Sequence, residues 1–216
     1  MKNKKILYIA IAAIVVIAVV LAIVFAGGNN KDNNNTTTTT TTQKPVELAY
    51  KDSLELLNKV LTSYNASAAE EAMLYVAGGN PDNFDTVSFD SPAKFVALED
   101  SSYNFHLGYP ESELPKLEDA SSMYNMMNAN IFNCYALKLT STTDVNALAD
   151  TLKNNILARQ WVCGMPEKLI IVSCPGNYLV VIWGVVADGG IVVPVADSIV
   201  ANIEGASIIV DVAIAE

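Results

Sequence analysis

The residues best suited to contact a ligand lie around the only histidine of the chain. Tyr103, Phe105, His106 and Tyr109 fall within one short segment, and Trp161 stands at the end of an expected helix. Aromatic side chains dominate both binding surfaces and protein cores. We therefore treat these five residues as candidate ligand-facing residues, for a sugar or a peptide. The alternative is an ordinary aromatic cluster that covers the core.

No pattern in the sequence assigns catalysis to these residues. His106 has no second histidine and no Ser or Cys partner at the spacing of a catalytic motif. The chain also lacks the G-x-S-x-G, H-E-x-x-H and phosphate-loop motifs. Two groups of carboxylates lack the spacing of a calcium loop and are interpreted as solvated surface: Glu111, Glu113, Glu118 and Asp119, and Asp82, Asp85 and Asp90. We expect no catalytic residue, no metal site and no cofactor.

The cysteines allow one disulfide at most. The chain has three, Cys134, Cys163 and Cys174, and an odd number cannot all pair within one chain. Cys134 and Cys174 both lie in expected strands, so this pair is the first disulfide to test. The alternative is that they are small buried apolar residues. A reactive thiol at Cys163 is a further alternative.

An apolar run near the start indicates where the protein is located. Ile6–Ala26 contains no charge and follows three lysines, Lys2, Lys4 and Lys5. As a helix it spans roughly 30 Å, the thickness of a bilayer core. The positive-inside rule then places residues 1–5 in the cytoplasm and the C-terminal part outside. The alternative is a signal peptide that is cleaved after Ala26, which would make the protein secreted.

Beyond this run, composition divides the rest of the chain into a linker and a domain. Residues 27–45 are rich in Asn and Thr, have no apolar residue able to pack, and are expected to form a disordered stalk. Residues 46–216 are expected to form one domain. The chain after Lys44 has 8 basic and 22 acidic residues, a formal charge of −14. That charge argues against nucleic acid as a partner. It indicates either a soluble surface or attraction to cations and basic peptides.

Apolar periodicity and capping residues predict the elements of this domain. We expect helices at 53–64, 68–77, 121–130, 143–161 and 194–204. We expect strands at 86–89, 94–98, 131–140, 169–174, 178–183 and 207–214. The predicted fold class is α+β, an antiparallel sheet with helices packed on one face, preceded by a single N-terminal transmembrane helix.

Several segments of the domain resemble a known group of proteins. They are Met126–Asn130, then Gln160–Pro166, then Pro175–Tyr178 before an apolar strand. This order resembles small extracytoplasmic proteins of anaerobic Gram-positive gut bacteria, which carry an N-terminal anchor or lipoprotein signal and one uncharacterised α+β domain. The resemblance covers roughly residues 53–204. It implies a location and a fold, and it implies no functional residue.

Three functions remain open from the sequence. The leading hypothesis is a non-enzymatic cell-surface binding or interaction domain, held off the membrane by a flexible stalk, whose partner is an envelope protein or glycan. The second is an envelope enzyme that acts on cell-wall or polysaccharide material. The third is a structural subunit of a surface assembly, which requires an exposed apolar patch and self-association.

Overall fold

A computed structural model describes residues 50–126, 130–161, 164–187 and 189–214. Within these ranges, no helix is both long enough and apolar enough to cross a membrane. The expected anchor Ile6–Ala26, the expected stalk at 27–45 and Cys163 all lie outside the described residues. Residues Lys44–Glu216 form one compact unit.

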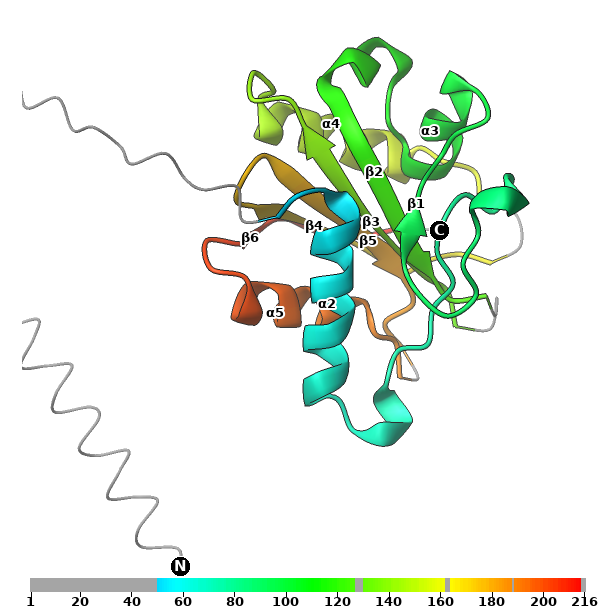
Figure 1. Ribbon diagram of the computed structural model, residues 1–216, viewed down its shortest axis with the longest axis vertical. Coiled ribbons are helices and arrows are strands. Elements are labelled where there is room, and N and C mark those ends of the chain that lie inside the picture. The colour runs from blue at the N-terminus through cyan, green and yellow to red at the C-terminus, as the bar shows by residue number, and fades with distance from the viewer. Residues whose placement is uncertain (1–49, 127–129, 162–163, 188, 215–216) are drawn as a thin grey trace, which may run out of the picture. The chain divides into compact units, whose positions relative to one another are not determined.

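The centre of the domain is a six-stranded sheet in the order β1-β2-β3-β5-β4-β6, and every neighbouring pair is antiparallel (Figure 1). The α+β antiparallel class predicted from the sequence is therefore confirmed. The strands are β1 (Ala93–Lys94), β2 (Leu117–Tyr124), β3 (Phe132–Leu139), β4 (Lys168–Cys174), β5 (Tyr178–Gly184) and β6 (Ser207–Ala213).

Helices cover both faces of this sheet, so the expectation that they pack on one face is wrong. Helices α2 (Ser53–Ser67) and α5 (Val192–Asn202) pack on one face (Figure 1). Helices α3 (Asp100–Leu107) and α4 (Val145–Leu157) pack on the other. Three short 3-10 turns complete the fold, at Glu70–Ala72, Phe84–Thr86 and Glu111–Lys116.

The composition of the central strands explains the two layers of helices. Every residue of β5 is buried, and its side chains alternate between the two core clusters. Val180 and Ile182 contribute to the cluster under α2 and α5, whereas Val181 and Trp183 contribute to the cluster under α4. A strand that is apolar at every position needs cover on both faces.

Most of the expected strands and three of the expected helices are confirmed. The strands at 131–140, 169–174, 178–183 and 207–214 correspond to β3, β4, β5 and β6. The helices at 53–64, 143–161 and 194–204 correspond to α2, α4 and α5, with shifted ends. Of the residues expected in strands at 86–89 and 94–98, only Lys94 belongs to the sheet, in the two-residue strand β1.

The caps of the helices explain where two of them begin. The Asp52 carboxylate accepts a hydrogen bond from the Glu55 backbone N–H at 2.9 Å, and Glu55 accepts one from the Lys51 N–H at 2.6 Å. This exchange is a variant of the capping box that the sequence predicts. At the start of α4, Asp144 is the N-cap, and its carboxylate accepts from the backbone N–H groups of Asn146 and Ala147 at 3.1 Å.

Two expected helices are absent from the described residues. Residues 121–124 continue strand β2, and the segment after α2 has only the turn Glu70–Ala72 before an extended stretch. The Asn65 side chain accepts from the Leu74 N–H at 2.8 Å and donates to the Leu74 carbonyl at 3.0 Å. Ala77 then pairs with Tyr124 of β2. These contacts satisfy the backbone of the extended stretch, so tertiary pairing replaces the helix.

Cys134 and Cys174, the pair for which the sequence allows a disulfide, are not bonded in the structure. Both cysteines are free and buried. Cys134 is in β3 and Cys174 is in β4, and β5 runs between these two strands. Strands separated by one intervening strand lie about 9.6 Å apart. A disulfide requires Cα atoms within about 7 Å, so these two residues pack as small apolar side chains.

Tyr50 is held at one end of the sheet. Its ring meets the Tyr178 ring edge to face, with centroids 6.2 Å apart, and its carbonyl accepts the Tyr178 hydroxyl at 3.0 Å. The next carbonyl, that of Lys51, accepts from the Lys138 ammonium at 3.3 Å. These contacts fix the start of the described chain to the ends of β3 and β5.

Candidate ligand-binding groove

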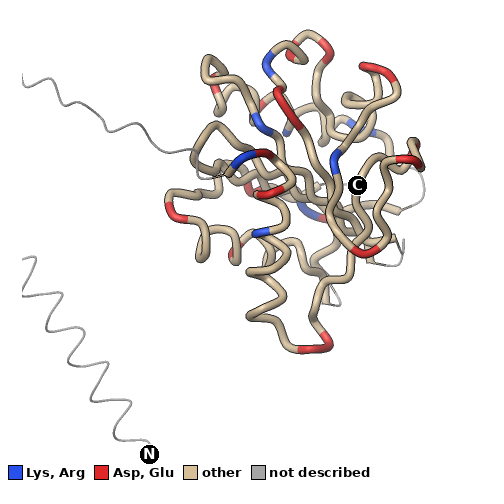
Figure 2. Tube along the Cα trace, viewed as in Figure 1, with Lys and Arg blue, Asp and Glu red and all other residues tan. Residues whose placement is uncertain are grey.

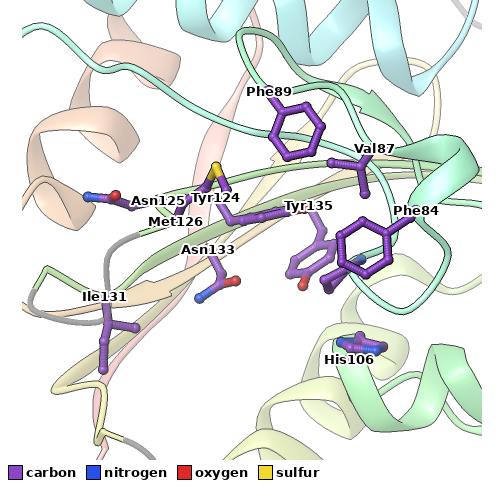
Figure 3. Close-up of a pocket in the computed structure, with 11 residues that line it drawn as sticks. Phe84, Val87, Phe89, His106, Tyr124, Asn125, Met126, Ile131, Asn133 and Tyr135 are labelled. Carbon is purple, nitrogen blue, oxygen red and sulfur yellow. The ribbon is translucent and has the colours of Figure 1, made fainter.

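An open groove of about 330 Å³ lies beside β2 and β3, near the ends at which Tyr124 and Asn133 pair (Figure 3). We call it the aromatic groove, because four of its side chains are Phe or Tyr. Its lining residues are Pro81, Phe84, Val87, Phe89, His106, Tyr124, Asn125, Met126, Ile131, Asn133 and Tyr135.

Three parts of the chain position these side chains. Phe84 and Phe89 come from the segment 80–90, on the side of the groove opposite the strands (Figure 3). Tyr124 ends strand β2 and Tyr135 lies within β3, so the sheet provides the second wall. His106 is in the last turn of α3 and closes one end.

Backbone contacts hold the segment 80–90 in place. Gly78 lies against the backbone of Ala93, where an added Cβ would come within 2.3 Å of the amide nitrogen. The Ser122 hydroxyl donates to the Gly79 carbonyl at 2.6 Å and accepts from its N–H at 2.8 Å. The side chain of the fully buried Asn80 donates to the Val96 carbonyl at 3.1 Å. The phenylalanines that follow are therefore carried on a fixed segment.

Large apolar side chains of the groove are exposed to solvent. The exposed fractions are 76% for Phe84, 63% for Phe89 and 59% for Met126. Single exposed apolar residues are ordinary, but several gathered around one concavity mark an interaction site. By contrast, Tyr135 is only 3% exposed and forms the floor, where its ring stacks on Trp183 with centroids 5.0 Å apart.

A histidine–carboxylate pair stands at the edge of the groove. The His106 Nε2 atom lies 2.5 Å from the Asp82 Oδ2 atom, and because a carboxylate is an acceptor, the imidazole N–H donates. The His106 side chain is 11% exposed and that of Asp82 is 56% exposed. The imidazole also contacts the rings of Phe95 and Phe105, at centroid distances of 5.6 and 4.9 Å. The ring is thus held, while the carboxylate remains open to solvent.

Of the five candidate ligand-facing residues, only His106 lines this groove. Tyr109 is fully buried, and its hydroxyl donates to the Glu113 carbonyl at 3.1 Å, so it is a core residue. Burial raises the pKa of this hydroxyl above its ordinary value. Tyr103 packs on Phe95, with ring centroids 5.6 Å apart, at a separate depression.

The other two candidates surround the only arginine of the chain. The Arg159 guanidinium lies 5.1 Å from the Phe105 ring centroid and 4.6 Å from that of Trp161. Trp161 also contacts Trp183, with centroids 6.3 Å apart. Phe105 and Arg159 line a second depression, beyond His106. The five candidates are therefore divided among the groove, the core, the depression at Tyr103 and the surroundings of Arg159, and they do not form one site.

The lining of the aromatic groove supports binding more than covalent chemistry. No Ser, Thr, Cys or Lys is among the described residues that line it, and the hydroxyls in that lining are the phenols of Tyr124 and Tyr135. Burial raises the pKa of both phenols, which disfavours the nucleophilic phenolate. Nor does the described part of the chain hold a group of three His, Cys, Asp or Glu residues able to bind a metal. What remains are apolar faces with a few polar groups, the usual composition of a ligand site.

Sequence reasoning missed the exposed residues of the groove. Phe84 and Phe89 stand in a segment rich in Asn, Asp, Ser and Pro, where turns are expected. Bulky aromatic residues in such a segment have no strand or helix face to cover. This composition was the one local signal for an exposed aromatic pair.

Comparison with known proteins adds no relative. A scan against protein-family models, a search of curated proteins and a search of solved structures each found no match. The resemblance to extracytoplasmic proteins of gut bacteria therefore stays a prediction.

Proposed function

We propose that the domain is a non-enzymatic binding module whose aromatic groove receives an apolar group of a partner protein. The observation that carries this proposal is the pair Phe84 and Phe89, exposed over a groove of about 330 Å³. A free domain gains little stability from side chains that remain mostly in water. Such side chains gain most when a partner covers them.

The chemistry of the lining favours a peptide side chain over a sugar. The rim consists of Phe and Met side chains, and the polar groups are few. Aromatic residues and Met are enriched at the centres of protein interfaces. A sugar needs many hydrogen-bond partners as well as a stacking face, whereas most of the described side chains that line this groove are apolar or aromatic.

We further propose that this module works at the cell surface. The apolar run Ile6–Ala26 and the lysines before it favour a single span with a cytoplasmic N-terminus and an outer domain. The Asn/Thr-rich residues 27–45 would then tether the domain and raise its concentration near envelope partners. If the run is removed after Ala26, the same module is secreted, and a mass measurement of the mature N-terminus distinguishes the two cases.

A pull-down with matched variants tests the proposal. The bait is the compact unit Lys44–Glu216, which contains both core clusters, and the source of partners is native cell envelope. The double substitution Phe84→Ala/Phe89→Ala should abolish recovery of a specific partner. Tyr75→Ala is the control, because Tyr75 is 77% exposed but does not line the groove. If both variants recover the partner equally, the groove is not the binding site.

One observation keeps an enzyme as a second candidate. The His106–Asp82 pair at the groove could act as a general base toward a bound water. An envelope hydrolase of this kind would lose activity on cell-wall or polysaccharide material with His106→Ala. The corresponding loss with Asp82→Asn should be smaller, because Asp82 orients the imidazole and does not accept the proton from water.

The exposed apolar rim also suits a structural subunit of a surface assembly. In that case the partner is a second copy of this chain. Sizing of the Lys44–Glu216 unit over a range of concentrations would show assembly, and Phe84→Ala/Phe89→Ala would abolish it. A monomer at all concentrations would leave the heterologous partner as the proposal.

A further inference from the structure

We propose that the aromatic groove selects ligands that are both apolar and positively charged, such as a lysine or arginine side chain in an apolar peptide. This inference rests on the proposed function, because it names the chemistry of the group that the groove receives. Three observations carry it: the ring faces in the groove, the accessible carboxylate at its edge, and the distribution of basic residues in the domain.

Four aromatic rings of Phe and Tyr line the groove. Phe84 and Phe89 stand on one side of the groove, with Tyr124 and Tyr135 on the other (Figure 3). The face of an aromatic ring carries partial negative charge and attracts an ammonium or guanidinium group. Several rings around one concavity are the arrangement by which proteins bind organic cations.

The carboxylate of Asp82 provides the second part. One of its oxygens accepts from His106, yet the side chain remains 56% exposed. Asp85 and Asp90, both exposed, belong to the same segment as Phe84 and Phe89. No Lys or Arg is among the described residues that line the groove. A ligand that carries a positive charge therefore finds an acceptor at the groove and no competing cation in its lining.

The basic residues of the domain provide the third part. The described residues include 8 Lys and Arg but 19 Asp and Glu, so the domain attracts cations over a distance (Figure 2). Most of these basic groups are also engaged within the domain. The lysines paired with carboxylates are Lys94, Lys116, Lys138, Lys153 and Lys168.

Arg159 is the one basic group that could favour an anion instead. Its charge lies near the hydroxyl of Tyr135, the residue that forms the groove floor. However, the guanidinium is held between the rings of Phe105 and Trp161, and Arg159 does not line the groove. Asp82 is also outside the lining, but it bonds to the side chain of the lining residue His106 and is open to water. The more exposed of the two charges is therefore negative.

Three probes with the same phenyl ring separate charge from apolar contact: phenethylammonium, 2-phenylethanol and phenylacetate. Each is titrated into the Lys44–Glu216 unit while amide resonances around the groove are followed by NMR, with the full chain in lipid nanodiscs as a second preparation. We expect phenethylammonium to bind about tenfold more tightly than 2-phenylethanol, and phenylacetate more weakly than both. Added salt should weaken binding of the cation and leave that of the alcohol unchanged.

Two variants locate the charge that is responsible. Asp82→Asn should reduce the affinity for phenethylammonium several-fold and leave that for 2-phenylethanol unchanged. Glu204→Gln is the control, because it also removes one negative charge from an exposed position. Glu204 lies between α5 and β6, and β6 is the edge strand opposite β1 in the sheet. If Asp82→Asn does not fold, the salt dependence of the unmodified domain carries the same test.

The outcomes separate this inference from the proposed function. Equal affinity for the cation and the alcohol, or an unchanged affinity in Asp82→Asn, overturns the charge preference and leaves an apolar groove. If phenylacetate binds most tightly of the three probes, the preference for cations is overturned, and the positive charge of Arg159 determines the selection. If none of the three probes shifts the groove resonances, the proposed function itself fails.

Discussion

Asn65 joins helix α2 to the segment that carries the groove, and its replacement should be costly. Its side-chain amide makes two hydrogen bonds to the backbone of Leu74, at 2.8 and 3.0 Å. The extended stretch that Leu74 begins then pairs with β2 through Ala77 and continues into Gly78 and the segment 80–90. Asn65→Ala removes both bonds without removing apolar contact.

The magnitude follows from the environment of Leu74. Each hydrogen bond contributes about 1 kcal/mol, and leaving the buried N–H and carbonyl of Leu74 without partners adds a further penalty. The substitution regains about 0.6 kcal/mol of folding free energy, because alanine has a higher helix propensity than asparagine. The expected net loss is about 2–3 kcal/mol in the free energy of unfolding.

Urea unfolding of the Lys44–Glu216 unit measures this loss. With a slope of about 2 kcal/mol per molar urea, the midpoint should fall by about 1 M at an unchanged slope. Asn58→Ala is the matched control on the same helix. The Asn58 side chain is exposed and bonds only to the Leu54 carbonyl of its own helix, at 3.0 Å. This control should change stability by less than about 0.5 kcal/mol.

The comparison of the two asparagines decides the question. If Asn65→Ala and Asn58→Ala have equal midpoints, the bonds to Leu74 do not hold the segment. Hydrogen exchange at the Leu74 and Ala77 amides gives a second readout. Both should exchange faster in Asn65→Ala, since the segment would open locally without global unfolding.

Two further predictions concern titratable groups. The pKa of Asp52 lies below its ordinary value, chiefly because the Glu55 backbone N–H bonds to the carboxylate and secondarily because of Lys94. A lowered pKa contributes stability above the unfolded-state pKa, and this stability is lost as the pH falls through the folded-state pKa. The difference in unfolding free energy between the native chain and Asp52→Asn, measured with urea, should therefore shrink below about pH 4. Burial raises the pKa of Cys174 to about 12 and that of Cys134 also above its ordinary value. In a background without the third cysteine, neither thiol should react with a disulfide reagent near pH 8 until the domain is unfolded, and rapid native labelling would contradict their burial.

The elements predicted correctly are those whose signals are local. Strands β4 and β5 are continuous apolar runs separated by Pro175-Gly176-Asn177, where Gly176 and Asn177 adopt φ angles of 83° and 63°. Such a turn depends only on its own residues. The apolar composition of β5 also held the information that helices cover both faces, and the prediction of one covered face overlooked it.

The elements predicted incorrectly depend on distant contacts. The helix expected at 121–130 rested on its three methionines. However, the Ser121 hydroxyl is 2.7 Å from the Ser53 hydroxyl, and the Ser122 hydroxyl bonds to Gly79. Ser67-Ala68-Ala69-Glu70 has the S-x-x-E pattern of a capping box, which favours a helix at 68–77. The pairing of the following stretch with β2 overrides this local preference. Local propensity is too weak to decide between states when such pairing is available.

The groove could be predicted only in part for the same reason. His106 attracted attention because it is the only histidine, and it does line the groove. Its partner Asp82 and the rings of Phe84 and Phe89 lie about twenty residues earlier, and Tyr135 lies about thirty residues later. No spacing rule connects these positions, because antiparallel pairing of β2 with β3 and the docking of α3 bring them together.

Tyr50 is anchored at the end of β3 and β5 opposite the groove. Tyr50 is fixed beside Tyr178, which pairs with Lys138, whereas the groove begins near Asn133 at the other end of β3. Lys138 is five positions after Asn133 along the extended strand, a distance of about 17 Å. A sensor surface or bead attached ahead of Tyr50 would therefore hold the domain at the end of the sheet away from the groove, which leaves Phe84 and Phe89 accessible to the solution.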